Sequence, residues 1–270
     1  MSQPFLTLVI PAYNKEQQIG ATLETVAAYL SKQEYSASIL VVDDGSSDGT
    51  RQVVRSYIEQ SDAPPDVRLL ENDHRGRGYA VRAGMLHATG KYILFTDADL
   101  ATPISETGKM IGSLEAGHDI AIGTREGIGA ARANEPYLRH LAGRTFNLIV
   151  RLSTGLGFHD TQCGFKGFRC EVARDLFNRV RLYGEDAKRL KGRAITGFDV
   201  EVLYLAVQRG YRIEEIPVRW KYRAGRRPTF LVDAPRMLSD VLKVRRMARH
   251  GVYDQKDSEG PADQSSEFGA

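Results

Sequence analysis

The stretch Lys91-Tyr92-Ile93-Leu94-Phe95-Thr96-Asp97-Ala98-Asp99-Leu100 begins as an apolar run and ends in two carboxylates one residue apart. The apolar run is typical of a strand that is buried on both faces of a parallel sheet. Asp97 and Asp99 would then follow the strand at the edge where open α/β sheets bind ligands. Two neighbouring carboxylates favour a divalent cation that also holds substrate phosphates. The alternative is that Asp99 caps the next helix and Asp97 is a solvated turn residue.

The composition is that of an ordinary globular protein with one large α/β domain, or one domain and an appendage. The 270 residues are 42% apolar and 26% charged, and the formal net charge of +3 does not indicate a nucleic-acid partner. Two cysteines are too few for a disulfide framework, which favours a reducing compartment. We expect no signal peptide, and no transmembrane helix, because no window approaches about 18 consecutive apolar residues.

Strand and helix patterns alternate along the chain. Strands are predicted at 5–10, 38–42, 67–70, 92–95, 119–123 and 211–223, with a turn and short strand over 159–169. Helices are predicted at 16–30, 50–59, 78–88, 105–116, 139–152, 171–178, 198–208 and 233–250, a mobile loop at 127–134, a turn at 61–65 and a loop at 183–192. This order specifies βαβ units and a parallel sheet whose strand-end loops gather on one edge.

The loops after the first two strands carry the residue types of a base-and-ribose pocket. Tyr13 offers a flat apolar surface, and Asp43 offers an acceptor for ribose hydroxyls or ring N–H groups. Gly45 has no side chain, so the ligand could come close to the backbone there. The alternative for Asp43 and its neighbour Asp44 is helix capping.

The third loop, residues 74–80, is basic and rich in glycine. Arg75 and Gly78 are candidates for phosphate binding, in which backbone N–H groups would face the phosphates. Arg77 is interpreted as a solvated residue at the start of a helix. The loop lacks a GxGxxG fingerprint and the chain lacks a Walker A motif, so phosphate handling is expected from a metal ion and arginines.

Four motifs, in order along the chain, resemble a known family: VIPAYNKE (9–16), VVDDGSSDGT (41–50), TDAD (96–99) and DTQCGFK (160–166). Together they resemble the family 2 inverting glycosyltransferases of the GT-A fold, over roughly residues 5–225. Within that family the chain is most similar to the polyprenyl-phosphate hexosyltransferases, in particular the dolichyl-phosphate β-glucosyltransferase branch. It departs from the family at Lys15, where the common pattern runs Asn-Glu directly, and at the C-terminus, where many relatives continue into transmembrane helices.

The resemblance implies a nucleotide-sugar donor and a Mg²⁺ or Mn²⁺ ion. Asp43 would contact the uracil or ribose, with Pro11, Tyr13 and Glu16 around it. The role of Glu16 depends on the inserted Lys15.

The metal ligands implied by the resemblance are Asp99, Asp97 and Gln162. Asp99 would bind the ion directly, Asp97 would share it beside the ribose and diphosphate, and Gln162 would add an amide oxygen. Arg125 and Arg144 match positions that engage phosphate in relatives; the alternative for each is a surface ion pair.

The implied reaction is transfer of glucose from UDP-glucose to a polyprenyl phosphate with inversion. The acceptor phosphate is already anionic, so it needs cationic positioning more than a general base. Asp199 would orient the acceptor or act as a base, unless it is only an acid at a helix N-terminus. The alternatives are GDP-mannose as donor, a non-lipid acceptor, a silent nucleotide-binding or scaffold protein, and a nucleotidyltransferase.

Three regions are predicted: a GT-A domain over 1–230, a basic amphipathic helix over 231–250 and a disordered tail over 251–270. The helix interleaves cations with an apolar face, which is typical of a membrane interface. The alternative is a helix packed on the domain with a solvated basic face. The resemblance favours the membrane, and implies a cytoplasmic protein that is peripheral at the inner face of the membrane. The oligomeric state is left open.

Overall fold

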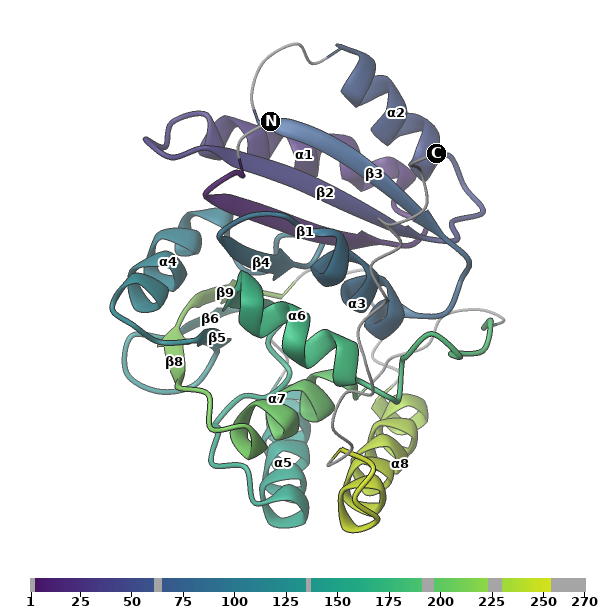
Figure 1. Cartoon of the computed structure of the whole chain (residues 1–270), viewed down its shortest axis with the longest axis vertical. Coiled ribbons are helices and arrows are strands. Elements are labelled where there is room, and N and C mark those ends of the chain that lie inside the picture. Colours follow the sequence, from purple (N-terminus) through teal and green to yellow (C-terminus); the bar gives the residue numbers. More distant parts are fainter. Residues whose placement is uncertain (1–2, 61–64, 135–136, 191–196, 223–229, 254–270) are drawn as a thin grey trace, which may run out of the picture.

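The computed structural model of the chain describes residues 3–60, 65–134, 137–190, 197–222 and 230–253, which form a seven-stranded sheet, a two-stranded sheet and surrounding helices (Figure 1). The strands are β1 Leu6–Ala12, β2 Ala37–Asp44, β3 Asp66–Asn72, β4 Tyr92–Thr96, β5 Ile120–Thr124, β6 Ala131–Ala133, β7 Phe165–Arg169, β8 Ile213–Pro217 and β9 Arg219–Lys221. The helices are α1 Glu16–Leu30, α2 Thr50–Gln60, α3 Arg77–His87, the 3₁₀ turn η1 Ile104–Glu106, α4 Thr107–Glu115, α5 Tyr137–Thr154, α6 Cys170–Arg179, α7 Phe198–Gln208 and α8 Phe230–Arg249.

The large sheet has the order β3-β2-β1-β4-β7-β5-β8, and all neighbours pair in parallel except those of β7. The prediction of a mostly parallel α/β sheet is therefore confirmed. The chain builds outward from β1 to β3 and then returns to place β4 on the other side of β1. The crevice at such a reversal is where α/β sheets bind ligands, and both β1 and β4 end there.

The antiparallel strand β7 brings a further segment to the same edge. Its first residue, Phe165, pairs with Thr96, the last residue of β4. Residues 160–164, which precede β7, therefore lie beside the residues that follow the parallel strands. The DTQCGFK motif reaches Asp97 for this reason.

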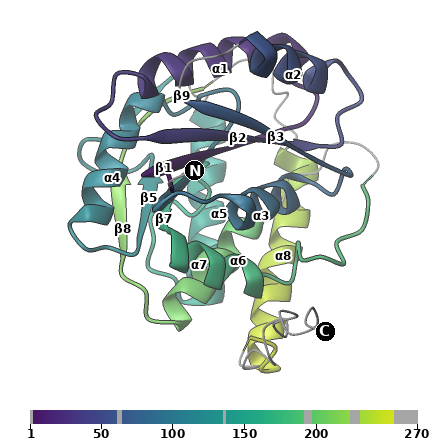
Figure 2. The same ribbon diagram turned by 45° about the horizontal axis from the view of Figure 1, so that its top comes forward.

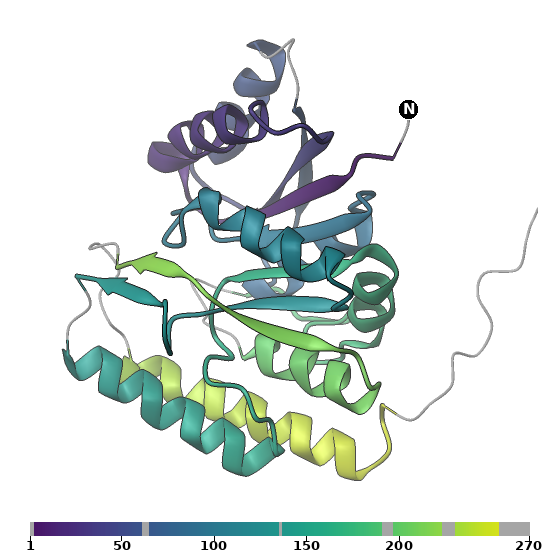
Figure 3. The same cartoon turned by 90° about the vertical axis from the view of Figure 1, so that its left-hand side faces the viewer.

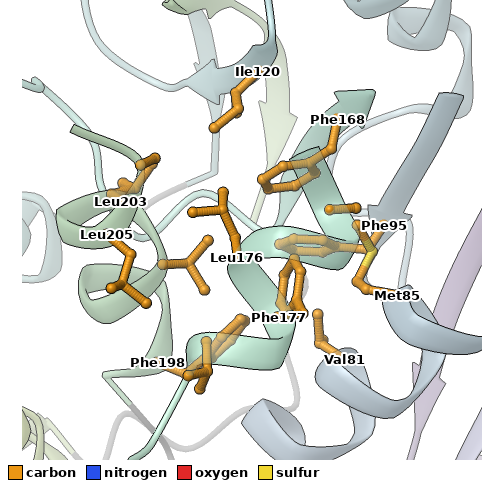
Figure 4. Packing of buried hydrophobic residues seen from close by; sticks show 14 of the residues in the cluster. Val81, Met85, Phe95, Ile120, Phe168, Leu176, Phe177, Phe198, Leu203 and Leu205 are labelled. Atoms are coloured by element: carbon orange, nitrogen blue, oxygen red, sulfur yellow. The ribbon is translucent and has the colours of Figure 1, made fainter. Parts of the chain in front are cut away.

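Apolar side chains alternate between the two faces of the sheet, as the pleat requires. Val9, Ile93 and Phe95 pack with α3, α6 and α7 in one core, whereas Leu8 and Leu94 pack with α1 and α4 in the other. Figure 2 shows these helices on opposite sides of the sheet. Figure 4 shows the first core, in which side chains of α3, α6 and α7 meet those of the strands. This burial on both faces explains the long apolar runs of β1, β2 and β4.

Two local predictions are wrong. The predicted mobile loop 127–134 contains β6, and the predicted single strand 211–223 is two strands, β8 and β9, that belong to different sheets. The break falls at Val218, directly after Pro217, which lacks the N–H needed to continue a ladder. Strand β9 then pairs with β6, and Lys221 N–H donates to the carbonyl of Ala101 at 2.8 Å, two residues beyond Asp99.

Helix α8 packs on the domain, against α5 and α7 (Figure 3). Val241 and Val244 of its apolar face are fully buried in the domain, whereas Leu242 is 53% exposed, so the predicted membrane contact of this helix stays a prediction. Its basic side chains point to solvent, as the alternative held. None of the described helices is both long and apolar enough to cross a bilayer. The turn residues 61–64, residues 191–192 at the end of the predicted 183–192 loop, and tail residues 254–270 lie outside the described ranges.

Candidate active site

Asp43 is the last residue but one of the buried strand β2, and one of its carboxylate oxygens makes no hydrogen bond within the described residues. Its Oδ2 accepts hydrogen bonds from Ser46 N at 3.0 Å and Arg51 Nε at 2.6 Å. Its Oδ1 is buried and has no hydrogen-bond partner among the described residues. A buried acceptor without a donor is costly, so this oxygen suits a hydroxyl or ring N–H group of a ligand.

Asp44, in contrast, organises the third loop. It accepts from Arg75 N at 2.9 Å, from Gly76 N at 2.9 Å and from His74 Nδ1 at 2.8 Å. Burial raises the pKa of Asp44, and these hydrogen bonds offset only part of that effect. The prediction that the backbone N–H groups of this loop face phosphates is wrong for residues 75 and 76, because both donate to Asp44.

The first loop is joined to the other two. The Tyr13 ring stacks on that of His74, with centroids 3.9 Å apart and planes 4° from parallel. A Cβ on Gly45, whose φ is 71°, would lie 2.4 Å from His74 N, which explains the glycine. Exposed Glu16 accepts a hydrogen bond from Gly49 N at 3.1 Å, which joins the first helix to the second loop. Half-buried Pro11 lies in β1 beside Val42.

Arg75 and Gly78 contact the segment before α7. Arg75 Nη1 donates to the carbonyl of Glu185 at 2.6 Å. A Cβ on Gly78 would lie 2.8 Å from the Tyr183 ring and 2.9 Å from Phe198 Cβ. Close packing therefore accounts for Gly78 without a phosphate.

Arg77 lies at the centre of the site, between carboxylates. Its Nε donates to Asp97 Oδ1 at 2.9 Å and its Nη1 to Asp199 Oδ2 at 3.4 Å, and its Nη2 is buried without a hydrogen-bond partner in the described part of the chain. Burial opposes its charge, but Asp97 and Asp199 outweigh burial and hold the pKa of the guanidinium above its ordinary value. Its interpretation as a solvated residue is wrong, because α3 begins between the end of β4 and the start of α7.

Asp199 is also paired with Lys166, a residue to which the sequence analysis gave no role. Lys166 Nζ lies 2.5 Å from Asp199 Oδ1, and both side chains are almost fully buried. A lysine between Phe165 and Phe168 in a buried strand requires such a partner, so the sequence did contain this signal. Both oxygens of Asp199 accept hydrogen bonds from cations, which favours a positioning role over that of a base.

Asp160 fixes the segment that carries Gln162. It forms a two-pronged ion pair with Arg125, at 2.6 and 2.8 Å, and accepts from Gln162 N at 3.2 Å. Burial would raise the pKa of Asp160, but Arg125 lowers it to about 2. The Arg125 guanidinium is thus engaged in a buried pair, neither the phosphate contact nor the surface pair considered above.

Arg144 is exposed on α5 and makes none of these contacts. Asn147, one turn further along the same helix, accepts from Thr161 Oγ1 at 3.1 Å.

The segment that carries Gln162 lies against Asp97 at this edge, and Asp99 follows Asp97 by two residues. A Cβ on Gly164 would lie 2.2 Å from Asp97 Oδ2, so the segment with Gln162 packs directly on Asp97. Asp99 Oδ1 accepts from Ala101 N at 3.1 Å, and its Oδ2 has no hydrogen-bond partner in the described ranges. Among the residues that the structure describes, no three His, Cys, Asp or Glu side chains form a metal-binding cluster. Two carboxylates and an amide fit Mg²⁺ or Mn²⁺, whose remaining ligands are commonly phosphate oxygens and water.

Gly164→Ala should reduce the transfer activity implied by the sequence motifs about 100-fold or more without unfolding the protein, because the new methyl group occupies the place of the Asp97 carboxylate and a small misplacement of such a group has a large effect. Gly157→Ala is the matched control, since a Cβ at Gly157 meets nothing within 4 Å. Activity and thermal unfolding are measured for both. Equal activity of the two variants would contradict this account of Gly164.

Asp160→Asn should lower the free energy of unfolding at neutral pH by about 2–3 kcal/mol, because it leaves Arg125 without its buried partner. The folded-state pKa of Asp160 lies below the unfolded value, so its stabilisation is complete above pH 4 and is lost as the pH falls towards about 2. Urea unfolding should therefore show the difference between wild type and variant narrowing over this range. Asp66→Asn, in the exposed pair with Arg68, should change stability by less than about 1 kcal/mol.

Comparison with known proteins places this geometry in context. Residues 7–177 match the profile of "Glycosyl transferase family 2". The chain is 34% identical over 268 residues to the dolichyl-phosphate beta-glucosyltransferase ALG5C of Trichomonas vaginalis, covering 95% of this chain and 75% of that protein. It is 31% identical over 267 residues to the dolichyl-phosphate beta-glucosyltransferase of Saccharomyces cerevisiae, covering 92% and 76%.

The fold has solved counterparts. The glucosyl-3-phosphoglycerate synthase of Mycobacterium tuberculosis, crystallised with Mn²⁺, uridine diphosphate and glucosyl-3-phosphoglycerate, superposes with a TM-score of 0.62 at 15% identity, over 94% of this chain and 82% of that one. At this identity the similarity concerns the fold alone.

Proposed function

The chain belongs to glycosyl transferase family 2, and on this premise we propose that it transfers glucose from UDP-glucose to a polyprenyl phosphate of the dolichyl type, with Mg²⁺ or Mn²⁺. The observation that carries the proposal is the meeting of Asp97, Asp99 and the Gln162 segment at the point where the strand order reverses. Relatives with about one-third identity over most of this chain are named as dolichyl-phosphate beta-glucosyltransferases, which supports the choice of sugar and acceptor.

The donor is held by the first two loops. The unpartnered Oδ1 of Asp43 accepts from the ribose or the uracil, and Tyr13 and Pro11 border the base. Gly45 allows the second and third loops to approach each other. Asp44 and Glu16 do not contact the donor in this proposal. Their carboxylates accept hydrogen bonds from backbone N–H groups and so hold the loops that form the pocket.

The diphosphate lies toward Asp97 and Asp99. With Gln162, these residues would hold the metal ion, which would supply a Lewis acid for the charge that develops on the leaving nucleoside diphosphate. Arg77 holds Asp97 in place, and its unpartnered Nη2 is a further donor on this side of the site.

The acceptor is an anionic phosphate oxygen that attacks the anomeric carbon from the face opposite the leaving group. An α-linked donor then gives a β-linked phosphosugar. The exposed Arg144 attracts the acceptor phosphate. Asp199 holds Arg77 and Lys166 in place at the start of α7. Because the acceptor is a membrane lipid, the protein works at the cytoplasmic face of a membrane as a peripheral protein. The exposed cations of α8 contribute attraction to that surface.

Donor turnover tests the proposal. Purified protein is incubated with Mn²⁺ or Mg²⁺, a short polyprenyl phosphate and either UDP-glucose or GDP-mannose, and both released nucleoside diphosphate and lipid-linked sugar are measured. Glucose transfer from UDP-glucose alone is expected. If product formed from GDP-mannose alone, the donor would be GDP-mannose and not UDP-glucose. Release of pyrophosphate would indicate nucleotidyl transfer.

A further inference from the structure

The outer face of α5 carries a row of exposed apolar side chains. Tyr137 is 76%, Leu141 50%, Leu148 54% and Leu152 77% exposed. Their spacings of four, seven and four residues put them on one side of the helix. The opposite side is buried in the domain through Phe146, Asn147 and Val150. This row includes four of the seven large apolar side chains that are exposed within the described ranges, so it is a patch and not scattered exposure.

Basic side chains border this row. The sequence of α5 contains no acidic residue, and Arg144 and Arg151 are exposed. Helix α8 lies alongside α5 (Figure 3), and five of its described side chains are exposed cations, Arg236, Lys243, Arg245, Arg246 and Arg249. The one acid among its described side chains, Asp240, is buried.

The positive charge of this surface distinguishes between two possible partners, a second copy of the chain and a lipid bilayer. A second copy of the chain would bring an equally basic face against this one, which is unfavourable. An anionic bilayer offers both headgroup charge for the cations and an apolar layer for the leucines.

We propose that the outer face of α5, bordered by the basic side chains of α8, docks on an anionic lipid surface with the α5 leucines entering the boundary of the acyl chains. The apolar contact comes mainly from α5, since Val241 and Val244 of α8 are buried in the domain and Leu242 is the one large apolar side chain that α8 exposes within the described ranges. This inference shares with the proposed function only the expectation of a lipid acceptor.

The docking surface is connected to the site. Asn147, on the buried side of α5, accepts from Thr161, the neighbour of Gln162. One helix thickness, about 10 Å, therefore separates the proposed lipid contact from the segment that carries a metal ligand. With the helix docked on the bilayer, the phosphate group of a lipid acceptor would therefore lie close to the proposed active site.

Vesicle binding tests the inference in the absence of any nucleotide sugar, so that its result does not depend on the transfer reaction. The full chain is sedimented with vesicles of equal parts phosphatidylglycerol and phosphatidylcholine. The variant with Leu148→Glu and Leu152→Glu should bind about tenfold or more weakly. A second variant with Leu148→Ser and Leu152→Ser should weaken binding less, because it adds no charge.

Val207→Glu, at an exposed apolar position on α7, is the matched control and should bind like wild type. Vesicles of phosphatidylcholine alone, or high salt, should weaken binding of the wild type. Thermal unfolding should be nearly unchanged in all variants, since the substituted side chains are exposed. The inference would be overturned if the Leu148→Glu, Leu152→Glu variant bound vesicles as tightly as wild type. It would also be overturned if the wild type formed a dimer and did not bind vesicles, and the variant was a monomer.

Discussion

Asp99→Asn should reduce glucosyl transfer by about 10²–10³-fold while leaving the free energy of unfolding within about 0.5 kcal/mol of wild type. The side chain keeps its shape and its Oδ1 can still accept from Ala101 N, so the loop should stay in place. What is lost is the negative charge at the oxygen that has no hydrogen-bond partner in the described structure, and with it the binding of a hard cation.

The measurement pairs turnover with metal binding. Isothermal titration of Mn²⁺ in the presence of UDP should show at least about a tenfold weaker metal affinity for Asp99→Asn. Asp66→Asn, at an exposed carboxylate far along the chain, should alter neither quantity. If Asp99→Asn retained both turnover and metal affinity, Asp99 would be a capping residue and the metal would be held elsewhere.

Arg77→Met should have the second large effect, on stability and on activity together. The substitution keeps much of the side-chain volume but removes the cation between Asp97 and Asp199, while the ion pair of Asp199 with Lys166 remains. Asp199 is buried, but Arg77 and Asp97 are about a quarter exposed, so the loss of stability should be up to about 3 kcal/mol, at the lower end of the range for buried ion pairs. Transfer should fall about 100-fold or more, because Asp97 is no longer held beside the Gln162 segment.

Arg77→Lys separates charge from geometry. A lysine restores a positive charge but cannot bridge two carboxylates with a planar fork. It should recover most of the lost stability and less of the activity, with UDP affinity intermediate. Arg68→Met, in an exposed pair, serves as the control. If Arg77→Met folded and turned over like wild type, the network would not organise the site.

Much of the fold follows from local patterns. The apolar run 92–95 is buried on both faces, as its composition requires, and the strands and helices around it alternate as βαβ units should. The antiparallel placement of β7 is not encoded locally. Its five residues pair between β4 and β5, which are far from it in sequence, and only this pairing brings Gly164 against Asp97.

The sequence predicted which residues lie at the site better than it predicted which residues they contact. Asp43 and Asp99 each have an oxygen without a hydrogen-bond partner in the described structure, as ligand-binding residues should. Asp44 and Arg125 were expected at the ligand and instead hold loops, because each has a partner brought close by the tertiary fold. Arg77 was misjudged for the same reason, since a position at a helix start gives no indication of which carboxylates lie opposite it.

The stereochemistry of the product tests the central claim most directly. Wild-type protein is incubated with UDP-glucose, Mn²⁺ and a short polyprenyl phosphate, and the anomeric configuration of the lipid-linked glucose is determined by NMR together with the amount of UDP released. We predict a β-linked glucosyl phosphate, one UDP for each product molecule, and loss of both after chelation or in Asp99→Asn. An α-linked product, or full turnover without metal or without Asp99, would contradict metal-dependent inverting transfer at this edge of the sheet.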